Sequence, residues 1–306
     1  MNEQGTDMWA RWLRGHRFRG GDRELRTQAD LDAVKEELLE RAAIESGDTV
    51  LDVGAGDGLV GLDALERVGP TGRVLFCDIS SALLTDAKRS AKDAGHGDRA
   101  AFIEANAEDL STVPDDSIDV VTMRSVLVYI AEKETALDEI ERVLKPGGRL
   151  SLFEPLPAAI PVERADTFLG YAVDDIEEPI PDEVRSLPGK IEGYRTDERE
   201  QDASTLAMDD RDLFGLAASA GFSDIRIEVS RWDTRAAETE EWDAWLDSSY
   251  APGVPTKREA IEAALTPAEQ AAFVEFVKPL VEGETIAYDR GATAALWAVK
   301  PPDRSQ

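Results

Sequence analysis

The sequence has 306 residues and is strongly acidic, with 63 Asp and Glu side chains against 34 Lys and Arg and a formal net charge of -29. This charge disfavours nucleic acid as a partner, because most of the surface would repel phosphates. No apolar run approaches the roughly 20 residues that span a bilayer, and no secretory signal is visible at the N-terminus, so we expect a cytoplasmic globular protein. The single cysteine, Cys77, excludes an intrachain disulfide and a cysteine-based metal site, and no metal is expected.

The basic residues are mostly arginines, because 9 of the 34 are lysines and the remaining 25 are arginines. An acidic composition with few lysines is typical of cytosolic proteins from salt-loving microbes. At 1 M salt the screening length falls to about 3 Å, which weakens the repulsion among surface carboxylates. The composition therefore favours a halophilic source.

Strand and helix patterns alternate between residues 48 and 154, which is typical of βαβ units and a parallel sheet. Apolar residues recur at helical spacing in the segments between the expected strands, and the last of these helices, 131–144, ends at the Pro-Gly-Gly sequence of 146–148. The predicted fold class is therefore α/β. The expected strands are five short apolar runs at 48–53, 73–78, 100–105, 118–123 and 149–154.

The later part of the chain breaks this alternation. A helix is predicted at 209–220 with Gly221 just after it, and Thr266, which is followed by proline, is typical of another helix start. Further strands are expected at 224–229 and 294–300.

These patterns divide the chain into core segments and insertions. The predicted parts are an N-terminal helical arm (1–46), the alternating core (47–154), an insertion (155–208), a continuation of the core (209–231), a second insertion (232–290) and a last core strand with the tail (291–306).

A glycine-rich turn in residues 52–58 (DVGAGDG), at the end of the first expected strand, is the strongest local signal. Glycines there let the backbone turn sharply and approach a bound ligand closely. About 20 residues further along the chain, Asp78 ends the second expected strand, where its carboxylate could accept hydrogen bonds from both hydroxyls of a ribose. The pattern therefore predicts a cofactor that contains a nucleoside.

Residues 56–61 also match the Gly-X-Gly-X-X-Gly fingerprint of dinucleotide-binding proteins, so a nicotinamide cofactor is an alternative. The match begins too late after the strand, since the first glycine of that fingerprint belongs in the immediate turn. Asp57 also stands at the expected helix start, where a pyrophosphate would need bare backbone amides. A cationic sulfonium ligand without phosphate tolerates an acidic residue there.

These motifs resemble those of class I S-adenosylmethionine-dependent methyltransferases, in the broad group that includes ubiquinone/menaquinone C-methyltransferases and many small-molecule methyltransferases. The resemblance covers about residues 45–154. It includes Asn106-Ala107 after the third strand, Arg124-Ser125 at the end of the fourth, and the Leu-Lys-Pro-Gly-Gly turn of 144–148. It implies a Rossmann-like, doubly wound sheet of seven mostly parallel strands, the last one antiparallel, with helical cap insertions that cover the ligand edge.

The same resemblance implies a cofactor, S-adenosylmethionine, and a set of residues that bind it. Asp52 and the glycines would surround the methionine part, Asp78 the ribose, and Ile79 the adenine. Arg124 departs from the small residue often found at its position. The full expected set is Asp52, Gly54, Gly56, Gly58, Asp78, Ile79, Asn106, Ala107 and Arg124.

Three further residues are candidates for contact with the methyl acceptor or for removal of its proton. Tyr129 follows the fourth expected strand and Glu154 ends the fifth, so both are expected at the ligand edge; ordinary packing is the alternative for each. His16 follows Trp9 and Trp12 in a segment with helical spacing. That arm is expected either to pack on the body or to cover the active site with His16 against the acceptor.

Other unusual residues have simple structural interpretations beside functional ones. Six arginines between residues 11 and 26 are expected to pair with the protein's own acids, or else to bind an anionic acceptor or an acidic partner. Trp232, Trp242 and Trp245 are expected to pack the cap or to line an apolar acceptor pocket. Cys77 is expected to be an inert core residue.

The predicted function is transfer of a methyl group from S-adenosylmethionine to an unidentified small-molecule acceptor by in-line displacement. The alternatives are a non-catalytic S-adenosylmethionine-binding regulatory protein and, less favoured, a nicotinamide-dependent oxidoreductase. An apolar cap that carries tryptophans favours an aromatic or quinone-like acceptor.

Overall fold

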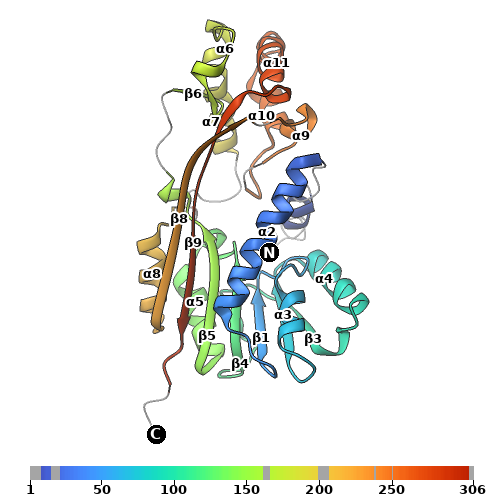
Figure 1. The fold of residues 1–306 in the computed structure, drawn as a ribbon, viewed down its shortest axis with the longest axis vertical. Helices are drawn as coiled ribbons and strands as arrows, with labels where there is room; N and C mark the ends of the chain where they lie inside the picture. Colours follow the sequence, from blue (N-terminus) through green and yellow to red (C-terminus); the bar gives the residue numbers. More distant parts are fainter. Residues whose placement is uncertain are drawn as a thin grey trace.

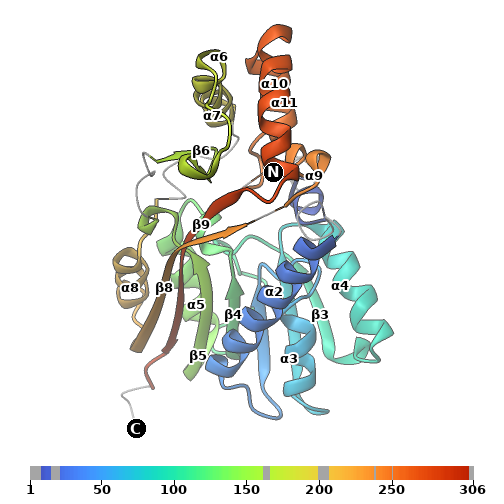
Figure 2. The ribbon, with the colours of Figure 1, turned by 45° about the horizontal axis from the view of Figure 1, so that its top comes forward.

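The computed structural model describes residues 8–14, 21–160, 166–198, 207–237, 239–249 and 251–302. Its core is a sheet with helices on both faces, and a helical cap projects beyond one end of the strands (Figures 1 and 2). Within the described residues the sheet has nine strands in the order β3-β2-β1-β4-β5-β9-β7-β6, and β8 also pairs with β9. This arrangement confirms the predicted α/β fold with an antiparallel last strand, and it adds the two short strands β6 and β7 to the seven that were expected.

Five parallel strands make up the first part of the sheet, at the positions expected from the apolar runs. The largest difference is at β5, which already begins at Leu144, because the Lys-Pro-Gly-Gly segment joins the strand through an irregular register opposite Ile118 and Val120. The parallel strands are β1 (Thr49–Val53), β2 (Arg73–Asp78), β3 (Ala100–Glu104), β4 (Ile118–Arg124) and β5 (Leu144–Pro155).

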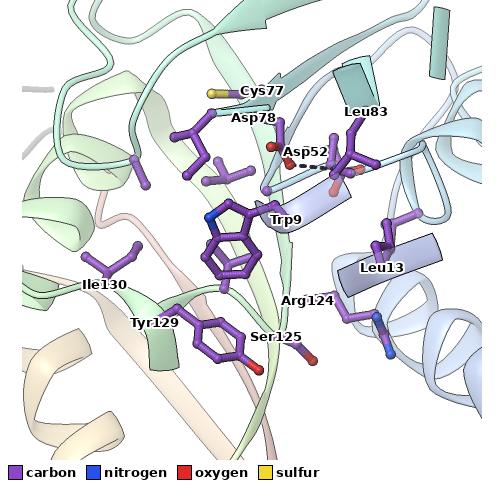
Figure 3. A pocket seen from close by; sticks show the side chains of 18 of the residues that line it. Trp9, Leu13, Asp52, Cys77, Asp78, Leu83, Arg124, Ser125, Tyr129 and Ile130 are labelled. Carbon is purple, nitrogen blue, oxygen red and sulfur yellow. Dashed lines mark hydrogen bonds between the residues drawn. The ribbon is translucent and has the colours of Figure 1, made fainter. Parts of the chain in front are cut away.

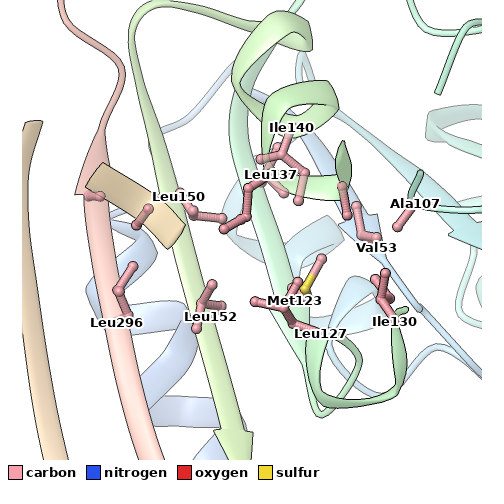
Figure 4. Packing of buried hydrophobic residues seen from close by; sticks show 14 of the residues in the cluster. Val53, Ala107, Met123, Leu127, Ile130, Leu137, Ile140, Leu150, Leu152 and Leu296 are labelled. Carbon is pink, nitrogen blue, oxygen red and sulfur yellow. The ribbon is translucent and has the colours of Figure 1, made fainter. Parts of the chain in front are cut away.

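Helices cover the two faces of this sheet and bury the alternating side chains of its strands. Val50 packs in the cluster beneath one layer of helices, and its neighbour Leu51 packs in the cluster on the opposite face, shown in Figure 4. The predicted cap of α8 is confirmed, since Asp209 forms a capping box and Gly221 has a φ of 95°. The two layers are α2 (Gly21–Ala42), α3 (Gly61–Arg67) and α4 (Ser81–Asp93) on one face, and α5 (Lys133–Val143) and α8 (Asp210–Ser219) on the other.

The last two long strands, β8 (Ser223–Ala237) and β9 (Ile286–Val299), extend well beyond the sheet as an antiparallel ribbon. The sequence prediction ended the first of them at residue 229 and began the second at 294, so the second insertion starts later and ends earlier than expected. The ribbon continues because Trp232 pairs with Gly291, where a Cβ atom would lie 2.1 Å from the indole ring. Glycine thus makes room for the tryptophan across the ribbon.

The two insertions pack together into one cap with its own apolar cluster. Trp242 and Trp245 stack with ring centroids 5.0 Å apart inside this cluster, so these two residues pack the cap as expected. Thr266 caps its helix through a capping box, which confirms the predicted helix start. The cap contains β6 (Thr167–Phe168), β7 (Tyr171–Ala172), α6 (Asp182–Arg185), α7 (Leu187–Asp197), α9 (Trp242–Leu246), α10 (Lys257–Ala264) and α11 (Pro267–Glu282).

Short 3-10 helices complete the described secondary structure. They are η1 (Gly97–Arg99), η2 (Leu127–Tyr129), η3 (Pro157–Ala159) and η4 (Val173–Asp175).

Candidate active site

A cavity of about 610 Å³ lies at the carboxyl ends of β1, β2 and β4 (Figure 3). Its volume falls within the range of about 300–1,000 Å³ that is typical of small-molecule sites. The ends of parallel strands meet at one edge of a sheet, so motifs far apart in the sequence come together here. Eight of the nine expected cofactor residues line the cavity: Asp52, Gly54, Gly56, Asp78, Ile79, Asn106, Ala107 and Arg124.

The glycine turn after β1 needs its glycines for two different reasons. Gly54 and Gly56 line the cavity with φ values of 68° and 56°, a left-handed conformation that other residues rarely adopt. Gly58 does not line the cavity, which corrects its expected role. It also has a positive φ, of 100°, and a Cβ atom there would lie 3.1 Å from Leu62, so Gly58 serves the packing of the turn against α3.

Asp52 is a buried carboxylate in the cavity wall, only 2% exposed. Its Oδ1 accepts a hydrogen bond of 2.8 Å from the hydroxyl of Thr122 on β4, while Oδ2 is buried and receives none from the described residues. Burial raises the pKa of Asp52 to about 7, although the Thr122 hydrogen bond opposes the rise. A buried oxygen without a donor favours a cationic ligand at this position.

Asp78 joins the end of β2 to the glycine turn. Its Oδ2 accepts a hydrogen bond of 2.8 Å from the amide of Gly56, and its Oδ1 accepts one of 2.8 Å from the amide of Ser80. Burial raises the pKa of Asp78 above its ordinary value, against the effect of these amides. Each oxygen keeps a second lone pair, so the carboxylate can still accept bonds from a ligand hydroxyl.

A further carboxylate, Glu108, also lines the cavity and was not expected from the sequence. It accepts a hydrogen bond of 2.6 Å from the side-chain amide of Asn106, one of the expected residues. Its position two residues after Asn106 is the only signal that could have found it.

Tyr129 lines the cavity from η2, at the acceptor edge where it was expected. Its ring meets the indole of Trp9 edge to face, with the centroids 5.2 Å apart and the planes at 76°. Burial raises the pKa of Tyr129 to about 12, and the charge of Glu154 adds to this effect. At neutral pH Tyr129 is therefore a hydrogen-bond donor and a poor proton acceptor.

Glu154 was expected to contact the acceptor, and the structure corrects this. Its side chain is fully buried and does not line the cavity. Oε1 accepts hydrogen bonds of 3.0 Å from the amides of Val126 and Leu127, and Oε2 accepts one of 3.1 Å from the amide of Val128. Burial raises the pKa of Glu154 to about 7. The residue holds the turn after β4 and does not reach a ligand.

The N-terminal arm contributes a wall of the cavity. Residues 8–14 are helical, and Trp9, Trp12 and Leu13 line the cavity at the spacing of one helix face. The indole nitrogen of Trp12 donates a hydrogen bond of 3.4 Å to the carbonyl of Ser249 in the cap. His16, the third candidate for acceptor contact, lies outside the described residues.

The cap was expected to cover the acceptor, but its residues between 166 and 290 that the structure describes do not line the cavity. The ribbon carries the apolar cluster of the cap beyond the sheet, where Trp242 and Trp245 pack against each other. The arm, which was expected to cover the site together with the insertions, lines the cavity without them in the described part of the chain.

Cys77 is buried, as expected, and it also lines the cavity. Burial raises the pKa of its thiol to about 12, so it is unreactive at neutral pH. The described part of the chain contains no cluster of His, Cys, Asp or Glu side chains suited to a metal ion. Within the same part, no helix has the length and apolar character to cross a membrane.

Residues 44–182 match a family model described as a methyltransferase domain. The ubiquinone/menaquinone biosynthesis C-methyltransferase UbiE of Hahella chejuensis is 37% identical over 116 residues, which are 38% of this chain and 46% of that protein, so the chain spans about half the length of this relative. The enzyme of the same name from Yersinia pestis is 30% identical over 186 residues, which are 60% of this chain and 70% of the relative.

A methyltransferase structure shares the fold. The phosphoethanolamine N-methyltransferase 2 of Haemonchus contortus, in complex with phosphomonomethylethanolamine and S-adenosylhomocysteine, has a TM-score of 0.51 at 16% identity and covers 88% of this chain and 52% of its own. The extent of the Yersinia match establishes the family. The chain is a class I S-adenosylmethionine-dependent methyltransferase.

The cavity of this methyltransferase fits its cofactor, S-adenosylmethionine. The buried Oδ2 of Asp52 suits a cationic ligand, and Gly54 and Gly56 bring the backbone of the turn to the cavity without side chains of their own. The nicotinamide alternative lacks such support, because the second glycine of that fingerprint must lie against the pyrophosphate, whereas Gly58 packs on Leu62 and does not line the cavity.

The affinity of the methyltransferase for S-adenosylmethionine should be about tenfold lower at pH 6 than at pH 8. At pH 6 the free protein carries Asp52 mostly protonated, since its pKa is about 7. Only the carboxylate attracts the positive cofactor, so binding must release the proton, at a cost of about 1.4 kcal/mol per pH unit. Calorimetric titration at both pH values measures this, and Asp52→Asn should bind weakly without the pH dependence. Equal affinities in the wild type would contradict the assignment.

Replacing Asp78 with alanine should weaken binding of S-adenosylhomocysteine by about 1–3 kcal/mol, through lost charge-assisted hydrogen bonds. The variant also loses the bond to the Gly56 amide, so the glycine turn becomes less ordered. Asp93→Ala, an exposed position at the end of α4, is the matched control and should bind normally. A folded Asp78→Ala variant of unchanged affinity would show that the ribose binds elsewhere.

Proposed function

We propose that the protein transfers the methyl group of S-adenosylmethionine to an apolar aromatic small molecule of the quinol or hydroxyarene type. The observation that carries this proposal is the aromatic pair of Trp9 and Tyr129 in the cavity wall, beside the residues proposed for the cofactor. Aromatic side chains favour a planar apolar ring through edge and face contacts. The names of the curated relatives, which are quinone-biosynthesis C-methyltransferases, support the same acceptor class.

The proposed mechanism uses the chain mainly to position the reactants. Bound S-adenosylmethionine supplies a methyl group that is already activated on a sulfonium. The glycine turn and Asp78 would fix the cofactor, while Trp9 and Leu13 of the arm form an apolar wall beside it. Alignment of the acceptor with the methyl carbon can contribute on the order of 7–11 kcal/mol to the lowering of the barrier.

Transfer of a tritiated methyl group tests this proposal directly. The acceptors are a naphthohydroquinone and, as a charged aliphatic comparison, phosphoethanolamine. We expect labelled product from the naphthohydroquinone alone. Transfer to phosphoethanolamine alone would contradict an aromatic acceptor. Labelling of other aliphatic amines, with no label on either of these two acceptors, would contradict it as well.

We further propose that the protein works in the cytoplasm of a cell with a high internal salt concentration. The net charge of -29 and the low lysine content support this. Its melting temperature should therefore rise between dilute buffer and molar KCl, because salt screens the repulsion among the carboxylates. Thermal melts followed by circular dichroism measure the effect, and a lower melting temperature in molar KCl would refute the proposal.

A further inference from the structure

One edge of the cavity carries polar side chains in an otherwise apolar region. Arg124 and Ser125 end β4, and Tyr129 follows them on η2. In the view of Figure 3 the polar ends of Tyr129, Ser125 and Arg124 follow one another along one side of the cavity, with Tyr129 nearest to the indole of Trp9. An acceptor ring against Trp9 would therefore have hydrogen-bond donors at one edge.

The described lining of the cavity carries more negative than positive side chains. Its described lining contains three carboxylates, Asp52, Asp78 and Glu108, and Arg124 is the cation among these lining residues. The charge of Arg124 acts on both Asp52 and Tyr129, since it opposes the rise of both pKa values. The positive charge of Arg124 is therefore close enough to affect both a cofactor residue of β1 and the aromatic wall.

The backbone at this edge is held in an uncommon conformation. Ser125 has a φ of 53°, which is rare for a residue other than glycine and is typical of functional sites when the surroundings enforce it. Its amide donates a hydrogen bond of 2.7 Å to the carbonyl of Phe153, and Glu154 holds the next three amides. The turn that carries Ser125 and Tyr129 is thus held in place by hydrogen bonds to Phe153 and Glu154 of β5.

Among the residues that the structure describes after β4 and at the end of β5, this edge offers donors but no proton acceptor suited to a general base. Tyr129 stays protonated at neutral pH, and Glu154 is buried behind the turn with its oxygens on backbone amides. An arginine and two hydroxyls can stabilise a negative oxygen, as in other sites that bind oxyanions. These described groups suit an acceptor that is acidic enough to bind as an anion.

Resting on the proposed function, we propose that Arg124, Ser125 and Tyr129 form an oxyanion subsite, which binds the hydroxyl of a phenol-type or enol-type acceptor in its deprotonated form. The hydroxyl proton leaves to water as the acceptor binds. The electron pair of the anion, delocalised onto the adjacent ring carbon, forms the bond to the methyl carbon while the carbon–sulfur bond breaks and its electrons stay on sulfur. The proton of that ring carbon then leaves to water. The subsite thereby replaces a general base with selective binding of the anion.

A coloured phenol tests the subsite without any methyl transfer. The probe is a nitronaphthol whose anion absorbs visible light, added to the protein saturated with S-adenosylhomocysteine and titrated over pH. We expect the pKa of the bound probe to fall by at least about one unit, which is a tenfold preference for the anion. Arg124→Gln should lose this shift, and Tyr129→Phe, which keeps the ring, should lose part of it. Arg89→Gln, an exposed arginine on α4, should keep all of it.

Each result decides between the two proposals. An unshifted pKa in the wild type, or the same shift in Arg124→Gln, would overturn the subsite, as would failure of both forms of the probe to bind. Calorimetric binding of S-adenosylhomocysteine verifies that each variant is folded and loaded. A shift that depends on Arg124 without methylation of any hydroxyarene would refute the proposed function and keep the subsite. Methylation of the naphthohydroquinone together with an unshifted pKa of the probe would refute the subsite and keep the proposed function.

Discussion

Replacing Gly54 with alanine should weaken binding of S-adenosylhomocysteine by more than about a hundredfold. The new Cβ atom would lie 2.1 Å from Cγ2 of Val126, closer than any real contact allows. The residue would also need a φ of 68°, and left-handed backbone costs a residue with a side chain about 1–3 kcal/mol. Either the glycine turn or the turn after β4 must move, and both line the cavity. Calorimetric titration measures the loss of affinity.

A matched control separates the collision from the backbone strain. Gly95 has a φ of 80°, and a Cβ atom there would meet nothing within 4 Å. Gly95→Ala should therefore lose some stability through strain but keep normal affinity. If Gly54→Ala binds S-adenosylhomocysteine as tightly as Gly95→Ala does, the glycine turn does not form the cofactor site.

Replacing Glu154 with alanine should lower the free energy of unfolding by about 3–5 kcal/mol. The change leaves the amides of Val126, Leu127 and Val128 without their acceptors in a buried place. An unsatisfied buried polar group costs about 1–3 kcal/mol, and partial access to water reduces the sum. Glu154→Gln keeps one accepting oxygen and should lose less. Urea unfolding followed by fluorescence measures both values.

An exposed glutamate serves as the comparison for this prediction. Replacing Glu134, in the first turn of α5, with alanine should change the free energy of unfolding by less than about 0.5 kcal/mol. A Glu154→Ala variant as stable as Glu134→Ala would show that the carboxylate does not hold the turn. Loss of methyl transfer without any loss of stability would instead return Glu154 to the catalytic role expected from the sequence.

The sequence predicted that the cofactor residues lie close together, because their proximity follows from the order and direction of the strands. Asp52, Asp78 and Arg124 lie at or near the ends of parallel strands, and such ends share one edge of the sheet whatever the loops do. The apolar runs were long enough to place these strands, and the glycine turn fixed the first of them. Side-chain positions that follow from strand order alone could therefore be predicted from local sequence patterns.

The direction of individual side chains could not be predicted in the same way. Tyr129 and Glu154 were both expected at the ligand edge, but Glu154 turns behind the edge because three amides of a distant turn bind it. Gly58 belongs to the expected motif but packs on Leu62. Such contacts join segments far apart in the chain, and no local spacing contains them.

The positions of the arm and the cap relative to the sheet could not be predicted from local sequence patterns either. The spacing of Trp9, Trp12 and Leu13 indicated a helix face, but did not decide whether this face packs on the body or covers the active site. The continuation of β8 past residue 229 depends on the pairing of Trp232 with Gly291 across the ribbon. Only the paired strands reveal why a tryptophan and a glycine occur at these positions.

The most direct test of the cofactor assignment is calorimetric titration of the wild-type protein with S-adenosylhomocysteine and, separately, with NAD. We expect that one S-adenosylhomocysteine binds per chain, that S-adenosylmethionine competes with it, and that NAD does not bind. Binding of NAD without binding of S-adenosylhomocysteine would contradict the cofactor assignment.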